Sequence, residues 1–143
     1  MNEELERILN ILLNLIIPPS HDGKMPGAAD VGFLGYVHNE NKLFWIKEGL
    51  QSIAKESHNK YGREFLALSD FEQAELIESL RRQLFQYFSR LTTEVINCYY
   101  QHDDVLEALG IEARPPFPQG YHIGKWNMTL LEPVYERGKI YRD

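Results

Sequence analysis

The sequence has one cysteine, Cys98, among 143 residues, and this shortage excludes several classes of site. A single cysteine forms no intramolecular disulfide and no zinc site built from several cysteines. Cys98 stands beside Val95 and Tyr99 on the expected inward side of a helix, where a free cysteine is typical of a small hydrophobic core residue. A nucleophilic role would need a histidine and a third group nearby in space, which spacing along the chain does not show.

Positive charge is scarce too, because 15 Lys and Arg stand against 21 Asp and Glu, for a formal net charge of −6. Phosphate binding usually needs a basic face, so we expect no nucleic-acid partner. The most apolar stretch, residues 11–17, falls far short of the roughly 20 residues that a membrane-spanning helix needs. Residues 2–7 before it are net acidic and the Arg81-Arg82 pair lies mid-chain, so neither a secretory nor a twin-arginine signal is expected. We therefore expect a cytoplasmic protein, with the periplasm as the alternative if it is exported with a partner.

Catalytic and cofactor motifs are missing as well. The five histidines are His21, His38, His58, His102 and His122. They form no HExxH or HxH pair, and the chain has no Walker A or GxSxG motif. The glycines of residues 27–35 do not match GxGxxG; those at 32 and 35 are instead expected to let another backbone come close. We therefore expect no enzyme activity, no cofactor and no metal in this chain.

One alternative stays open, a stand-alone small helical enzyme or ligand-binding protein. His21 and Asp22 are adjacent in a loop, Asp30 stands near a Gly-rich turn, and His38 follows about two helical turns later. Acid and base partners must meet within hydrogen-bond reach, so this alternative requires the four side chains to converge in a closed pocket.

Helical periodicity is what the sequence does contain. With 43% apolar residues, a chain of this length can bury a core, and the pattern predicts an all-α protein, an irregular bundle of about five helices. The expected helices cover residues 3–17, 26–37, 42–61, 69–99 and 103–109. Ser69 and Glu72 form a capping box, and Gly110 closes the last helix. The helix from residue 69 is so long that a break near residues 81–85 is expected.

Periodicity also assigns aromatic residues to the core. Phe44, Phe71 and Phe85 fall on the inward faces of their expected helices. Phe85, Phe88 and Tyr99 form a stripe at helical spacing, which indicates core packing.

Beyond the helices the composition changes, and we predict a helical domain of residues 1–110 followed by an extended C-terminal arm of residues 111–143. The arm is rich in proline and aromatic residues and shows no convincing helical period from residue 121 onward. Its large side chains are of types enriched at protein interfaces, so the arm is expected to pack on its own domain or on a partner. The candidate partner-binding residues are Arg114, Phe117, Tyr121, Trp126, Met128, Tyr135 and Tyr141.

Several short segments together resemble a known family. They are Ile16-Ile-Pro-Pro19, Asp22-Gly23, Pro26-Gly-Ala-Ala29 and Phe65-Leu-Ala-Leu-Ser69, the last followed by an acidic helix. These are similar to segments of the gluconate 2-dehydrogenase small subunit (subunit 3) family. The end of the chain, with Arg114-Pro-Pro-Phe-Pro118, Trp126 and Leu131-Glu-Pro133, resembles the variant tail of some members.

This resemblance implies an all-α, non-catalytic accessory subunit without a flavin or haem of its own. Its partner would be a large flavoprotein dehydrogenase of the glucose–methanol–choline oxidoreductase type, with a cytochrome c subunit as a possible third component. The small subunit would help the large one to fold, mature or be exported. Many members begin with a twin-arginine signal that this sequence does not show, which favours a stabilising or maturation role.

Overall fold

The computed structural model describes residues 2–39, 42–113 and 127–138. Of the described residues, 72% are helical; they form seven α-helices and no strands, so the predicted all-α class is confirmed. It divides into two units, residues 1–113 and residues 114–143. The predicted division into a helical domain of residues 1–110 and an arm of residues 111–143 is a statement about which part folds on its own, and it stays a prediction.

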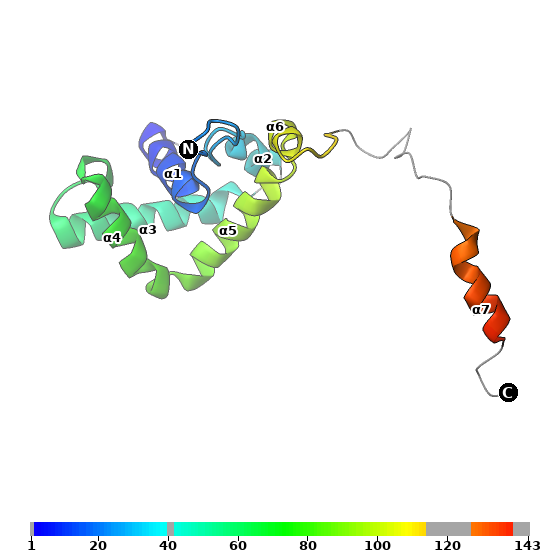
Figure 1. Ribbon diagram of the computed structural model, residues 1–143. Helices are drawn as coiled ribbons and strands as arrows, with labels where there is room; N and C mark the ends of the chain where they lie inside the picture. The colour runs from blue at the N-terminus through cyan, green and yellow to red at the C-terminus, as the bar shows by residue number, and fades with distance from the viewer. Residues whose placement is uncertain (1, 40–41, 114–126, 139–143) are drawn as a thin grey trace. The chain divides into compact units, whose positions relative to one another are not determined.

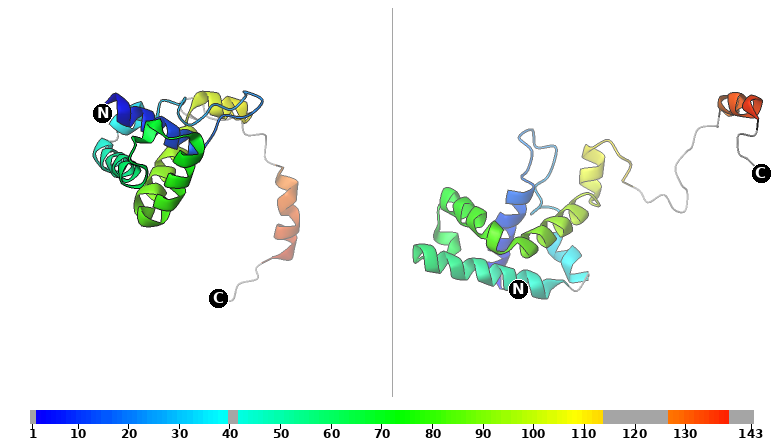
Figure 2. Two further views of the ribbon diagram at one scale, coloured as in Figure 1. Left: turned by 90° about the vertical axis from the view of Figure 1, so that its left-hand side faces the viewer. Right: turned by 90° about the horizontal axis from the view of Figure 1, so that it is seen from below.

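The first unit holds six of the helices, and four of these build its centre. The elements are α1 (Glu3–Ile16), α2 (Phe33–Asn39), α3 (Leu43–Tyr61), the 3₁₀ turn η1 (Phe65–Ala67), α4 (Asp70–Gln83), α5 (Phe85–Tyr99) and α6 (Asp103–Ala108). In Figure 1, α4 and α5 form a V, and α3 passes behind α1. Figure 2 shows from below that α1 crosses between α3 and the α4–α5 pair, and α1 contacts both α3 and α5.

The helix ends follow the local signals in the sequence. The Ser69 N–H donates to Glu72 Oε2 at 2.8 Å and the Glu72 N–H donates to Ser69 Oγ at 3.3 Å, so the predicted capping box is present. The long helical pattern breaks at Leu84, whose φ of −105° and ψ of 37° lie outside the α region. Gly110, with φ +72°, follows α6 in the left-handed conformation that closes a helix.

The second helix differs from its prediction, because α2 begins at Phe33 instead of Pro26. Residues 18–32 form a loop that is held both by local hydrogen bonds and by bonds to other elements. The Ala28 N–H donates to Ile17 O at 2.9 Å, and the Tyr99 hydroxyl donates to Pro26 O at 2.8 Å. Gly32 has φ +70°, which no α-helix accommodates. These tertiary contacts override the helical pattern.

The core of the first unit lies where α1, α3 and α5 meet. Its fully buried members include Ile8 and Leu12 on α1, Ile46 on α3, and Leu91 on α5. Burial of a side chain of this size contributes about 1.5–3 kcal/mol, so these contacts hold the crossing helices together.

Three aromatic assignments to the core were wrong. Phe44, Phe71 and Phe85 are 74%, 77% and 68% exposed. Each is the first or second residue of its helix, so its side chain projects past the part of the helix that meets a neighbour. Phe88 and Tyr99, further along α5, are buried as expected.

The second unit carries a short helical segment in the arm, where the sequence shows no convincing helical period. The 3₁₀ turn η2 (Met128–Leu131) leads directly into α7 (Glu132–Arg137). Pro133 stands in the first turn of α7, where its missing N–H breaks no helical hydrogen bond. The two elements together span only ten residues, too few for periodicity to indicate a helix. Among residues 2–39, 42–113 and 127–138, no helix combines the length and apolar character that crossing a bilayer requires.

Candidate partner-binding groove

The acid–base candidates of the N-terminal loop serve local backbone turns. Asp22 accepts hydrogen bonds from Ser20 Oγ at 2.7 Å and from the Lys24 N–H at 3.2 Å, and the first of these lowers the pKa of Asp22 most. Asp30 accepts from the Gly27 N–H at 3.1 Å. Both carboxylates therefore stabilise loop geometry.

The two histidines of the same alternative, His21 and His38, are exposed. Neither they nor the two aspartates line either hollow described below. In the part of the chain that the structure describes, no three His, Cys, Asp or Glu side chains are placed to hold a metal ion. The alternative therefore gains no support from the geometry.

Cys98 also lies in a structural setting. It is 6% exposed, and its Sγ is 3.9 Å from Val31 O. Burial raises the pKa of the thiol, which disfavours the thiolate that a nucleophile needs. Cys98 is a core residue, consistent with its position in the helical pattern.

A mostly buried ion pair joins α5 to the start of α3. Lys42 Nζ lies 2.7 Å from Glu94 Oε2, and the Tyr36 hydroxyl donates to the same oxygen at 3.0 Å. Burial raises the pKa of Glu94, but the hydrogen bonds from Lys42 and Tyr36 outweigh it, so that the net pKa is lowered. With its oxygen already bonded twice, Glu94 serves to position helices.

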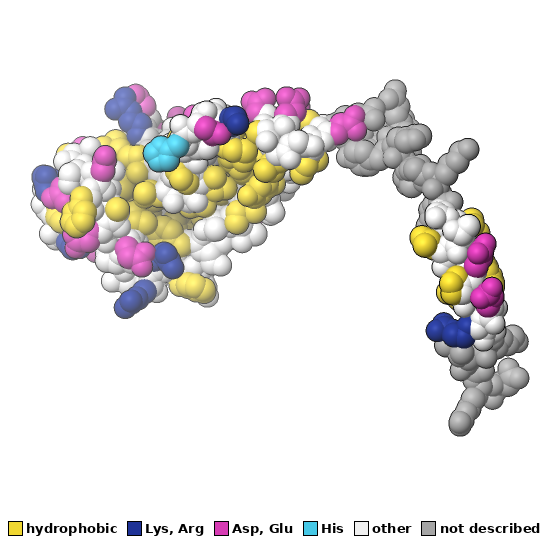
Figure 3. Space-filling view, viewed as in Figure 1, with side chains coloured by type: hydrophobic (Ala, Val, Ile, Leu, Met, Phe, Trp, Pro, Cys, Tyr) yellow, Lys and Arg dark blue, Asp and Glu magenta, His cyan; other side chains and the backbone are white. Residues whose placement is uncertain are grey.

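The principal hollow of the first unit is a groove of about 790 Å³ between α1, α4 and α5, here called the α1/α4/α5 groove. Figure 3 shows hydrophobic side chains gathered across the middle of this unit, where α1 and α5 lie in Figure 1. The apolar residues lining the groove are Leu12, Leu15, Ile16, Ala74, Ile77, Phe85, Phe88 and Leu91.

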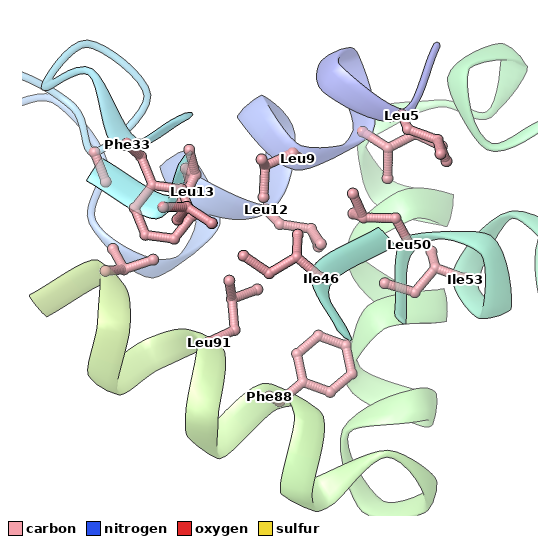
Figure 4. Packing of buried hydrophobic residues seen from close by; sticks show 14 of the residues in the cluster. Leu5, Leu9, Leu12, Leu13, Phe33, Ile46, Leu50, Ile53, Phe88 and Leu91 are labelled. Carbon is pink, nitrogen blue, oxygen red and sulfur yellow. The ribbon is translucent and has the colours of Figure 1, made fainter. Parts of the chain in front are cut away.

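The groove has a buried floor and exposed walls. Leu12, Phe88 and Leu91 are at most 9% exposed, and Figure 4 shows their side chains extending from α1 and α5 into the shared core. Leu15 is 49% exposed and Phe85 is 68% exposed, so both present apolar surface to water. The floor is fixed by core packing, while the walls offer surface that another molecule can bury.

A second hollow of about 570 Å³ adjoins the first along α4. It is lined by Phe71, Ala74, Glu75, Glu78, Ser79 and Arg82. Ala74 and Glu78 also line the α1/α4/α5 groove, so the two hollows are neighbours that share these two residues. Arg81 and Glu78 form an exposed ion pair of 3.3 Å on the rim. An exposed pair of this kind contributes little to stability.

The partner-binding residues predicted for the arm are only partly visible. Met128 and Tyr135 are 58% and 71% exposed, within a unit that has no buried residue among those described. Arg114, Phe117, Tyr121, Trp126 and Tyr141 lie outside the described residues. The arm as a binding surface stays a prediction.

Phe71 and Phe85 are surface residues that the helical pattern assigned to the core. For the two phenylalanines a signal was present, since Phe71 follows the Ser69 cap by two residues and Phe85 follows the expected break.

Comparison with protein families matches residues 3–109 to the family described as Gluconate 2-dehydrogenase subunit 3. Neither the comparison with curated proteins nor that with solved structures gave a match. The matched region spans α1 to α6, contains every residue of both hollows, and ends before the arm. It covers well over half of the 143 residues. The chain therefore belongs to the gluconate 2-dehydrogenase subunit 3 family.

Proposed function

We propose that this chain is a non-catalytic accessory subunit that binds a large flavin-dependent dehydrogenase of the glucose–methanol–choline oxidoreductase type. Binding stabilises the large subunit or helps it to mature. The substrate class is a sugar, a sugar acid or a polyol. A cytochrome c subunit is a possible third component of the complex.

The observation that carries this proposal is the family match over residues 3–109, because the family is described as a subunit of gluconate 2-dehydrogenase. A subunit of a dehydrogenase implies further subunits in the complex. Support also comes from the α1/α4/α5 groove, whose exposed apolar walls are typical of a surface that another protein covers. The mechanism is linkage, since a partner that binds only the folded form of the dehydrogenase raises the stability of that form.

We further propose that the complex forms in the cytoplasm, where the large subunit is made. The periplasm is the alternative site of action if the two subunits are exported together. Fractionation of cells that carry a tagged chain separates these cases by the compartment in which the assembled complex is found.

The proposal is tested by tagging the full-length chain at its native expression level and purifying it from its own cells. We expect an identified flavoprotein dehydrogenase to co-purify in near-equal amount, with flavin absorbance and substrate-dependent reduction of a dye. The tag alone is the control. The purified chain on its own should reduce no dye with gluconate or a polyol. Turnover by the chain alone, or a purification that contains no oxidoreductase, would refute the accessory role.

A further inference from the structure

We draw no further inference here: the strongest candidate, the α1/α4/α5 groove with its exposed apolar walls at Leu15 and Phe85, carries none because nothing in the structure shows what covers it.

Discussion

Gly49 on α3 lies directly against the ring of Tyr87 on α5. Helix propensity alone would make Gly49→Ala stabilising, but this contact predicts that it destabilises the fold. A Cβ added at Gly49 would lie less than 3.0 Å from three ring carbons of Tyr87. Carbon atoms in contact normally lie about 3.5–4.0 Å apart, so the nearest ring carbon would have to withdraw by about 1.5–2 Å. Trp45 and Phe88 flank it at centroid distances of 5.8 and 5.3 Å, which leaves little room.

The magnitude follows from two opposing terms. Replacing glycine by alanine inside a helix gains about 1 kcal/mol from propensity. Overpacking a core usually costs about 1–3 kcal/mol, and the confined ring of Tyr87 places Gly49→Ala toward the upper end. We therefore expect a net loss of about 1–2 kcal/mol in the free energy of unfolding. That corresponds to a fall in Tm of roughly 4–8 °C for a domain of this size.

Gly35 provides the matched control, because it too lies in a helix, is exposed, and has nothing within 4 Å of its added Cβ. Gly35→Ala should raise the free energy of unfolding by about 0.5–1 kcal/mol. Urea unfolding followed by circular dichroism measures both variants. In a Tyr87→Leu background the cost of Gly49→Ala should vanish or reverse. If Gly49→Ala proves as stable as the wild type, the packing of α3 on α5 described here is wrong.

Two further predictions concern ionised groups and caps. The pKa of Glu94 is lowered in the folded protein from its ordinary value of 4.5. The ionised carboxylate therefore stabilises the fold at pH values above 4.5, and this contribution is lost as the pH falls through the folded pKa. Glu94→Gln should therefore lower the free energy of unfolding by about 1–3 kcal/mol at pH 7. It should also flatten the loss of stability below about pH 4.5, as measured by urea unfolding across pH. An unchanged loss of stability in acid would contradict this. Ser69→Ala removes the hydroxyl that caps α4 and should cost about 1 kcal/mol by the same measurement, whereas Ser69→Asp should retain most of the stability.

The helical class and most helix ends were predictable from sequence because their causes are local. The capping box at Ser69, the left-handed glycine at 110 and the break at Leu84 depend on residues a few positions apart. The start of α2 was not predictable in this way. Pro26 is held in a loop by the hydroxyl of Tyr99, 73 positions away, and no helical pattern reports such a contact.

The glycine prediction failed for the same reason. Gly32 and Gly35 were expected to allow a close approach, yet no atom lies within 4 Å of a Cβ added at either. Close approaches occur instead at Gly27, where Asn14 Oδ1 would lie 2.6 Å from an added Cβ, and at Gly49. The partner of Gly49 is a side chain 38 positions further along, on a helix that crosses α3. Sequence indicates where a glycine stands in a helix, but only the packing of helices shows which glycine is required.

The candidate site was the least predictable part, because a groove depends on the relative placement of three helices. Exposed phenylalanines alone do not identify it, since single exposed apolar residues are common on protein surfaces and Phe44 is one of them. Phe85 differs from Phe44 in lining a groove whose floor is already fixed by the core, and Phe71 differs from it in lining a neighbouring, fully exposed hollow. Folding gives no reason for an aromatic residue at these positions, because aromatic residues are only moderate helix formers and these two bury little of their surface in the fold. Their removal should therefore cost binding and not stability, which distinguishes a docking surface from an incompletely packed core.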